Sequence, residues 1–522
     1  MGYAPSGLYE EQSYESLPER EMLELAGQKF SLARIARVAR DEEQVVLSKD
    51  ARERMEASRR TVERIISEGR VVYGVNTGFG KLADVHILPE DLTKLQANLV
   101  RSHSCGVGPA LAEAETRAML LLRANVLALG YSGARPIVAE ALLLMLNRGV
   151  LPVIPEKGSV GASGDLAPLA HLALTAIGEG EAFYRGVRMP SADALRRAEI
   201  EPLRLEAKEG LALLNGTQAM AAVGALALER AERLARIADV AGAMSLEALR
   251  GTPTAFDPRI HELRPHPGQI AAAEHLRSLM LESQIRASHL ENDPRVQDAY
   301  CLRCMPQVHG AVRYTLAYSR GVVEIETGSA TDNPLVFAET GEVLSGGNFH
   351  GAPLALSFDY ASIALTDLAS ISERRIDRLV NPDVNEGLPA FLSANPGIAS
   401  GFMIPQVVAV ALLSECKVLA HPASTDNLPT SGAKEDHVSM GMTAALKLRT
   451  IVGNAELVIA IELLAGAEGL EYLKPLLPGR GVRRAYEIVR GHVPRLQQDR
   501  PLSSAIQEIA ELIRNGEFDL AE

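Results

Sequence analysis

The sequence predicts a mainly α-helical protein, in which a large bundle of long helices follows a smaller, mixed N-terminal domain. After about residue 115, long Ala- and Leu-rich stretches repeat their apolar residues at helical spacing. Strand patterns are confined to short pieces such as residues 335–345, where two apolar runs flank a Gly-containing turn. Hydrophobic residues make up 47% of the 522 residues and aromatic residues only 4%, so we expect a core of Ala, Leu, Val and Ile.

We expect the chain to divide into three parts. Residues 1–25 are polar and predict a flexible N-terminal arm. Residues 26–125 mix short apolar runs with single helices and predict a mixed α/β domain, which carries the loop around Tyr73. Residues 126–522 contain no low-complexity linker and predict a continuous central and C-terminal helical bundle.

Local patterns predict the elements of each part. Apolar spacing predicts helices at about residues 49–68 and 89–101. Between them, residues 71–87 (VVYGVNTGFGKLADVHI) are rich in Gly and Asn, which predicts a buried strand end that runs into a loop. In the bundle, residues 225–250 place apolar side chains on one helical face. Similar patterns recur at residues 270–290, 310–325, 355–380, 405–420, 440–470 and 480–515.

Charge and cysteine content exclude several classes of protein. Lys and Arg total 53 and Asp and Glu total 66, so the formal net charge of −13 argues against nucleic acid or an anionic membrane as the main partner. Four cysteines are too few for a disulfide framework. The N-terminal residues do not resemble a signal peptide, and no uninterrupted apolar run approaches the roughly 18 residues of a membrane span. We therefore expect a cytoplasmic protein.

No metal site is expected from the sequence. Cys301 and Cys304 have CxxC spacing, but no second Cys or His pair lies at the distance that a zinc site requires. Two partly buried thiols are the simpler interpretation. His261, Glu262 and His266 miss the HExxH spacing by one residue.

Residues 158–174 (GSVGASGDLAPLAHLAL) form the candidate reactive segment. Asp165 and Pro168 predict the first turn of a helix. A flexible loop with an ordinary N-cap is the simplest interpretation. The strongly apolar flanks nevertheless predict burial, and a buried glycine loop must satisfy all of its backbone polar groups.

The tripeptide Ala162-Ser163-Gly164 offers a chemical reason for such a loop. In a tight turn, the nitrogen of Gly164 can attack the carbonyl of Ala162, two waters leave, and the side chain of Ser163 becomes an exocyclic methylidene. The product, 4-methylidene-imidazole-5-one (MIO), is an electrophile made from the chain itself. Glycine suits the third position because a side chain there would crowd ring closure. An adjacent helix N-terminus would stabilise negative charge on the electrophile.

Several ordered blocks give the sequence a specific resemblance. Over about residues 30–520 it resembles the MIO-dependent aromatic amino acid ammonia-lyase family. The blocks are YGVNTGFG (73–80), NLVRSHSCGVG (98–108), GSVGASGDLAPLAH (158–171), GLALLNGTQ (210–218), QDAYCLRCMPQVHGA (297–311), TDNPLVF (331–337), SGGNFHG (345–351), GFMIPQ (401–406) and TSGAKEDHVSMG (430–441).

The resemblance implies roles for individual residues. Ser163 would supply the electrophile, and Tyr73 would be the base that removes the β-proton of the substrate. A phenol with an ordinary pKa near 10 needs a lowered pKa for that role, through neighbouring donors or positive charge. Arg303 would grip the substrate carboxylate, and Asn215 would hydrogen-bond and polarise the MIO ring. The other residues that the resemblance places in the pocket are Gln297, Tyr300 and Phe349.

Two positions bear on the choice of substrate. The resemblance implies that His103 disfavours phenylalanine and that Glu435 faces the imidazole of a histidine substrate. A carboxylate can accept a hydrogen bond from imidazole, whereas it has no partner on a phenyl ring. Met403 is also the residue expected for histidine. Lys434 stands beside Glu435, where it could pair with that carboxylate. The departures from the usual pattern are Arg101, Met305, His309 and Lys434.

The implied activity is the deamination of L-histidine to trans-urocanate and ammonia. The alternatives are the same chemistry on tyrosine and a MIO-dependent 2,3-aminomutase, which would add the captured amine back. A helical assembly protein that has lost activity is disfavoured by the intact tripeptide. The resemblance also implies a homotetramer with shared active sites, so Tyr73, Tyr300 and Phe349 need not lie near Ser163 within one chain. No external cofactor or metal is expected.

Overall fold

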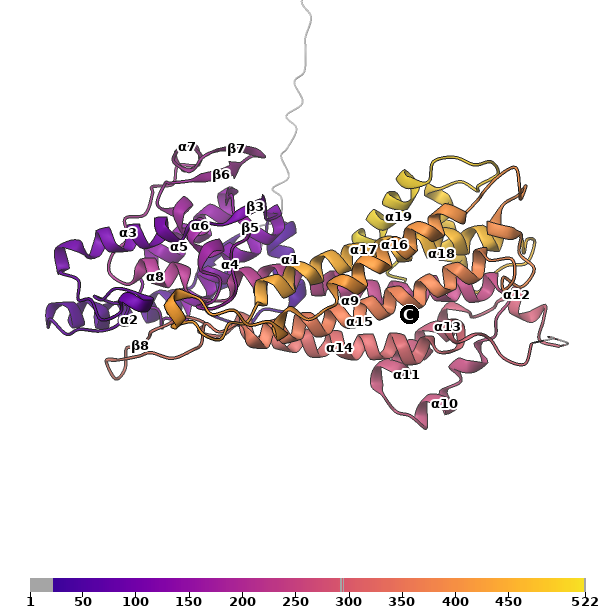
Figure 1. Cartoon of the computed structure of the whole chain (residues 1–522), viewed down its shortest axis with the longest axis horizontal. Helices are drawn as coiled ribbons and strands as arrows, with labels where there is room; N and C mark the ends of the chain where they lie inside the picture. Colours follow the sequence, from indigo (N-terminus) through magenta and orange to yellow (C-terminus); the bar gives the residue numbers. More distant parts are fainter. Residues whose placement is uncertain (1–21, 292, 294, 521–522) are drawn as a thin grey trace, which may run out of the picture.

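The computed structural model describes residues 22–520 apart from positions 292 and 294. Most of the arm predicted at residues 1–25 therefore lies outside the described residues, and its last three residues, Leu23–Leu25, form strand β1. Helices dominate the molecule, which confirms the predicted fold class (Figure 1). The molecule is elongated, with a mixed N-terminal part at one end and long helices running away from it.

The N-terminal part packs helices against three small sheets. Strand β1 pairs in parallel with β2 (Val45–Leu47), and β3 (Val107–Ala110) pairs with β5 (Pro155–Lys157). The third sheet has the order β4-β6-β7. Its strands are β4 (Val150–Pro152), β6 (Glu181–Tyr184) and β7 (Val187–Pro190). The helices are α1 (Leu32–Arg40), α2 (Lys49–Ser67), α3 (Leu92–His103), α4 (Glu113–Ala128), α5 (Pro136–Arg148), α6 (Leu166–Ala176), α7 (Ser191–Arg197) and α8 (Glu209–Leu214).

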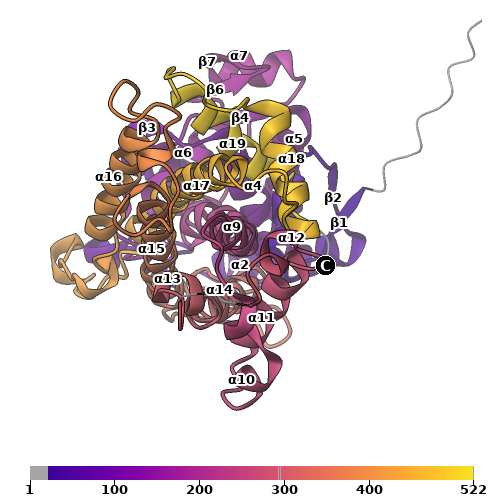
Figure 2. The ribbon, with the colours of Figure 1, turned by 90° about the vertical axis from the view of Figure 1, so that its right-hand side faces the viewer.

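Five long helices form the bundle. They are α9 (Gln218–Ala248), α14 (Met305–Thr327), α15 (Ala352–Val380), α16 (Met403–Leu419) and α17 (Gly441–Glu471). Figure 2, a view along the bundle, shows α9 at its centre with the other long helices and the C-terminal helices around it. The shorter helices are α10 (Pro258–Glu262), α11 (Pro267–Leu279), α12 (Gln284–Ala287), α13 (Tyr300–Arg303), α18 (Arg480–His492) and α19 (Ser503–Asn515).

Small side chains explain how these helices approach one another. Almost all of α9 is buried, and its residues are mainly Ala, Leu, Val and Gly. A Cβ atom on Gly224 would overlap the ring of Phe358 on α15, so glycine at this position lets the aromatic ring lie against the α9 backbone. The predicted hairpin is also present, because β8 (Leu335–Phe337) pairs with β9 (Glu342–Leu344).

Residues 71–87 depart from the prediction of a buried strand end. The segment before Gly80 is made of turns and irregular loop with one isolated bridge, from Thr77 to His86. Residues 74–78 are buried as predicted, whereas Val71 is 61% exposed. The backbone N–H groups of Val75 and Asn76 donate to the carbonyl of Val72, and the Asn76 side chain accepts from the Val72 N–H. These local hydrogen bonds satisfy the backbone, so the segment does not need a neighbouring strand.

Among the residues that the structure describes, three helices are long and apolar enough to cross a membrane by length and composition. This differs from the expectation drawn from uninterrupted apolar runs, because a span can contain up to two charged residues and still be apolar on average. In α15 and α17 the apolar windows are 67% and 78% buried inside the protein, where neighbouring helices cover them. The apolar window within Met403–Thr425 is only 22% buried, so α16 keeps an exposed apolar face.

Candidate active site

The segment before α6 is a tight, buried turn in which two glycines are required. Gly161 and Gly164 have φ angles of +66° and +77°, which L side chains rarely adopt. A Cβ atom at position 164 would overlap the backbone of Gly216, and one at position 161 would overlap the hydroxyl of Ser439. Gly164 and Gly216 also form an isolated backbone bridge. The turn therefore depends on segments that are distant in sequence.

Asp165 lies at the predicted start of the helix, but its side chain has a different role from a helix cap. It occupies the cap position of α6, but its side chain makes no cap hydrogen bond there. Its carboxylate instead accepts from Ser159 Oγ at 2.7 Å and from the backbone N–H of Met220 at 2.8 Å. Burial raises the pKa of Asp165 to about 6, although these donors oppose the rise. Asp165 thus ties the reactive turn to the first turn of α9.

A cavity of about 580 Å³ lies over this turn. It is formed where the Tyr73 loop, the end of α3, the reactive turn, the end of α8 and two loops from the second half of the chain meet. Seven of the predicted site residues line it. They are Tyr73, His103, Ala162, Ser163, Asn215, Phe349 and Glu435.

Asn215 and Glu435 hold Ser163 from two sides. The Asn215 side chain donates from Nδ2 to the Ser163 carbonyl at 2.7 Å, and Ser163 Oγ donates to Glu435 Oε1 at 2.8 Å. Asn215 Oδ1 is buried and has no hydrogen-bond partner. The turn accepts no side chain at Gly164, and Asn215 already binds the carbonyl that would become the ring carbonyl. These residues fit an MIO group formed from Ala162, Ser163 and Gly164.

Glu435 is an ionised carboxylate in a half-buried position. Burial alone would raise its pKa, but hydroxyl donors outweigh burial and hold the pKa below its usual value. Thr430 and Ser431 each donate a hydroxyl to Oε2 at 2.7 Å, in addition to the bond from Ser163. Among the described residues, Lys434 makes no ion pair with Glu435. Because ring formation would remove the Ser163 hydroxyl, Oε1 of this carboxylate would then be available to a group inside the cavity.

The pKa of Tyr73 is raised, whereas the sequence argument requires a lowered one. Burial is the largest cause, the backbone of Gly80 opposes it, and the negative charge of Glu435 adds to the rise. Further hydrogen-bond donors or positive charge would be needed to reverse this shift. The residues that one chain gathers around Tyr73 bring a carboxylate to the phenol instead.

Four predicted site residues lie outside this cavity. Tyr300 and Arg303 form α13, which lies toward the opposite end of the bundle from α6 and α8 (Figure 1). Tyr300 is 71% exposed, and the Arg303 guanidinium lies 4.5 Å from the centre of its ring. Gln297 is exposed in the preceding loop, and Met403 begins α16. One chain therefore does not bring these residues to Ser163.

The structure adds residues that the sequence argument missed. His350 and His437 line the same cavity and stack with their ring centres 5.8 Å apart. Phe79, in the Tyr73 loop, also lines it. His350 and His437 fall inside the blocks SGGNFHG and TSGAKEDHVSMG, so their position in those blocks was the available signal.

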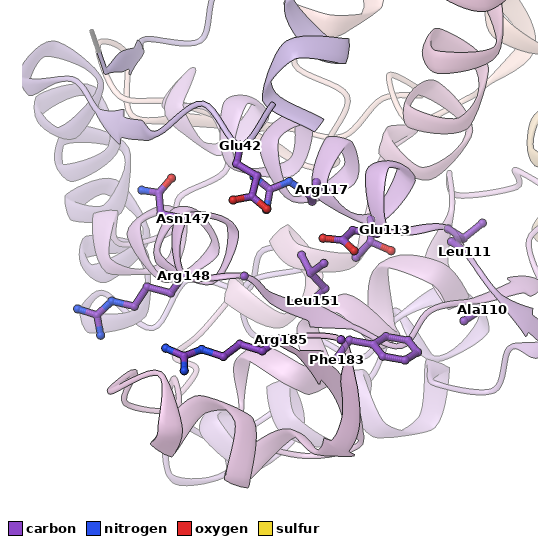
Figure 3. A pocket seen from close by; sticks show the side chains of 13 residues that line it. Glu42, Ala110, Leu111, Glu113, Arg117, Asn147, Arg148, Leu151, Phe183 and Arg185 are labelled. Carbon is purple, nitrogen blue, oxygen red and sulfur yellow. The ribbon is translucent and has the colours of Figure 1, made fainter. Parts of the chain in front are cut away.

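No metal centre is formed by the described residues, because no group of three or more His, Cys, Asp or Glu side chains converges there. Cys301 and Cys304 are free and half-buried. A second cavity of about 570 Å³ lies between the ends of α4 and α5 and the turn that joins β6 to β7 (Figure 3). Charged side chains of both signs line it, including Glu42, Glu113 and Arg148, but none of the predicted site residues does.

Comparisons with known proteins agree with this geometry. The family model described as aromatic amino acid lyase matches residues 30–491. A histidine ammonia-lyase of Myxococcus xanthus is 56% identical over 96% of this chain and 98% of its own length. The crystal structure of histidine ammonia-lyase from Trypanosoma cruzi is 42% identical, with a TM-score of 0.89 over 95% of this chain and 94% of that one.

A tyrosine aminomutase from Streptomyces globisporus also has this fold. It is 39% identical, with a TM-score of 0.90 over 95% of this chain and 98% of that chain. The family model covers most of the chain, and the Myxococcus relative shares more than half of its residues over nearly the full length. The chain therefore belongs to the aromatic amino acid lyase family.

Proposed function

We propose that the protein is a cytoplasmic histidine ammonia-lyase, which converts L-histidine to trans-urocanate and ammonia. The observation that carries this proposal is the carboxylate Glu435, which lines the cavity beside Ser163 and whose pKa is held below its usual value. A carboxylate can accept a hydrogen bond from an imidazole N–H and favours imidazolium. Beside a phenyl ring it would lose hydration without gaining a partner. The high identity to curated histidine ammonia-lyases supports the same substrate.

Ala162, Ser163 and Gly164 would cyclise to the MIO group. The group supplies an electrophilic carbon that takes up the substrate amine and turns it into a better leaving group. Asn215 would hold it through the hydrogen bond to the Ser163 carbonyl. The N-terminus of α6 directly follows the tripeptide and favours negative charge at that point.

Tyr73 would take the β-proton of the substrate onto its phenolic oxygen. Its raised pKa in the isolated chain means that it needs a nearby cation to act near neutral pH. We propose that Arg303 of another subunit brings this charge when it binds the substrate carboxylate. Glu435 would orient the imidazole, and His103, at the end of α3, would line the pocket around that ring.

The assembly that this requires is a homotetramer with shared active sites. Gln297, Tyr300 and Arg303 lie away from Ser163, and the buried Nε of Arg303 has no hydrogen-bond partner among the described residues. The long helices also expose apolar side chains that a second subunit would cover. These exposed side chains are Tyr314, Tyr318, Leu356, Tyr360, Ile363, Ile404, Val407, Val410 and Val418.

The test is a product assay with L-histidine, L-tyrosine and L-phenylalanine side by side. We expect urocanate from L-histidine and little product from the other two. A cinnamate-type product from L-tyrosine would instead support a tyrosine lyase. A β-amino acid from any of these substrates would support an aminomutase. Ser163→Ala is expected to abolish the near-ultraviolet absorbance of the ring and nearly all turnover. A fully active Ser163→Ala enzyme, or intact protein that has not lost two waters in mass, would contradict the proposal.

A further inference from the structure

A network of buried charges crosses the bundle far from the Ser163 cavity. Asp239 on α9 is fully buried and accepts from His275 Nδ1 at 2.9 Å and from His309 Nδ1 at 2.6 Å. Arg313 also pairs with this carboxylate. These three donors hold the pKa of Asp239 far below its usual value, although burial opposes them. The network thus begins at the Asp239 carboxylate, whose buried negative charge is stabilised by three donors.

Arg375 and Glu462 form the second half of the network. Both side chains are fully buried, and Arg375 binds the Glu462 carboxylate through Nε at 2.5 Å and Nη2 at 2.9 Å. Ser245 and Ser372 donate to the same carboxylate at 2.7 Å and 2.6 Å. This bidentate pair fixes the plane of the guanidinium. It leaves Nη1 as the nitrogen that is free for other partners.

Nη1 of Arg375 links His309 to α13. It lies 3.4 Å from His309 Nε2 and 3.4 Å from the carbonyl oxygen of Cys301. A guanidinium can only donate, so Nε2 of His309 must accept, and its proton must lie on Nδ1, which faces Asp239. Burial lowers the pKa of His309, which favours this neutral form.

The link ends at the backbone of the turn that carries Tyr300 and Arg303. The backbone hydrogen bonds of this four-residue helix, Tyr300–Arg303, lie within the turn or go to Ala299, so they do not fix its orientation against α15. The carbonyl of Cys301 is therefore a contact that can set how the turn sits on α15. The Arg303 guanidinium, stacked over the Tyr300 ring, moves with that turn.

We propose that His309 and Arg375 are positioning residues that fix the Tyr300–Arg303 turn and thereby set how tightly Arg303 binds the substrate carboxylate. This inference rests on the carboxylate-binding role proposed above for Arg303.

Two variants of His309 separate positioning from stability. In His309→Gln the amide reaches the place of Nε2 and can still accept from Arg375. In His309→Asn it reaches only the place of Nδ1 and can still donate to Asp239. Each variant loses one of the two buried hydrogen bonds, so both are expected to lower the melting temperature. Only His309→Asn is expected to loosen the turn.

The readout is the affinity for two imidazole ligands, measured as inhibition of the assembled enzyme. Imidazole-4-propanoate carries the carboxylate that Arg303 would bind, and 4-ethylimidazole lacks it. In His309→Asn and Arg375→Lys we expect KM for L-histidine and Ki for imidazole-4-propanoate to rise about five- to tenfold, the effect of losing one hydrogen bond. Ki for 4-ethylimidazole and the ring absorbance should not change. His309→Gln should resemble the unmodified enzyme in all of these values.

Controls distinguish a failure of this inference from a failure of the proposed function. His275→Gln alters the same Asp239 without contacting Arg375, so it should leave both Ki values unchanged. Arg303→Lys should raise Ki for imidazole-4-propanoate, and if it does not, the proposed role of Arg303 is wrong. If Arg303→Lys has this effect while His309→Asn and Arg375→Lys leave both Ki values unchanged, or change them equally, the positioning role is overturned.

Discussion

Glu435 illustrates how a single side chain can select a substrate. Once ring formation has removed the Ser163 hydroxyl, the hydroxyls of Thr430 and Ser431 would keep Glu435 ionised against the cost of burial. Glu435→Gln is expected to lower kcat/KM for L-histidine by about ten- to a hundredfold, because a neutral amide replaces a charge-assisted hydrogen bond to imidazole. Residual turnover of L-tyrosine should fall less. Steady-state kinetics with both substrates measure this, and an equal loss on both would remove the argument for imidazole selection.

The buried carboxyl group of Glu247 predicts that the stability of the folded protein depends on pH. Glu247 is 1% exposed and accepts from the backbone N–H of Gly479. Burial raises its pKa from 4.5 to about 7. The folded state therefore holds this proton more tightly than the unfolded state. The contribution of this proton to the free energy of unfolding is fully present below about pH 4.5 and is lost as the pH rises through about 7.

Glu247→Gln should remove this dependence because the amide stays neutral. At a pH of about 8 the variant is expected to melt at a higher temperature than the unmodified protein, by a free-energy difference of up to about 3 kcal/mol. At a pH of about 5 the two should melt closer together. Thermal unfolding followed by circular dichroism at both pH values measures this. A gap that is larger at the lower pH would show that the sign is wrong.

At the level of single residues, the sequence predicts which residue type a position requires better than it predicts the groups that surround that residue in the fold. The requirement for glycine at position 164 follows from the chemistry of the tripeptide and agrees with the close approach of Gly216. Asp165, in contrast, is predicted as a helix cap but binds the start of α9. The burial and the nearby Glu435 charge that raise the pKa of Tyr73 are also not predicted from the sequence. Both depend on groups that are distant in sequence, which local patterns do not contain.

Among the secondary-structure elements, two glycines in long helices predict opposite effects of the same substitution. Gly224 on α9 lies against the ring of Phe358, whereas a Cβ on Gly453 of α17 would meet nothing within 4 Å. Gly453→Ala is expected to stabilise the protein by about 0.5–1 kcal/mol through helix propensity. Gly224→Ala should destabilise it by about 1–3 kcal/mol, because the added methyl group overlaps the ring.

Thermal or denaturant unfolding of the two glycine variants makes this comparison. Since both substitutions give the same gain in helix propensity, the difference between them reports packing alone. If Gly224→Ala were as stable as Gly453→Ala, the close contact between α9 and α15 would be absent in solution.

The long helices are predictable because their Ala and Leu periodicity is strong and local. Helix α2 (Lys49–Ser67) matches the predicted range 49–68 within one residue. The prediction fails at residues 71–87, where Gly and Asn allow turns that satisfy the backbone without a strand partner. The predicted stretch 480–515 divides into α18 and α19, and prolines at 494 and 501 lie between them. The domain limits 26–125 and 126–522 stay predictions.

For the whole molecule, the exposed apolar face of α16 predicts assembly. Val407 is 52% exposed there, close to Ile404 and Val410. Val407→Glu is expected to dissociate the tetramer and to lower specific activity by more than about tenfold, because a buried unpaired charge opposes association. Light scattering and activity measured on the same sample check this. Val187→Glu is the matched control, because Val187 is 58% exposed on the distant strand β7 and should tolerate the charge.

An active, tetrameric Val407→Glu protein would contradict this interface. The assembly is also the property that the sequence of one chain does not predict. The blocks around Arg303 and Ser163 both predict site residues, but the chain places α13 far from the Ser163 cavity. Motifs in one sequence do not say which copy of the chain a residue serves, because that depends on how surfaces of separate molecules meet.

The bridge between Gly164 and Gly216 has a consequence for the stage of folding at which the proposed ring can form. Gly216 precedes α9, so the close approach of the two glycines requires the first half of the chain to be folded. A nascent chain that has not reached this stage holds Ala-Ser-Gly as an ordinary, inert tripeptide. The proposed ring would then arise only during maturation, after a pocket exists to shield it. In this way the fold would delay a reactive group until stray cellular nucleophiles can no longer reach it easily.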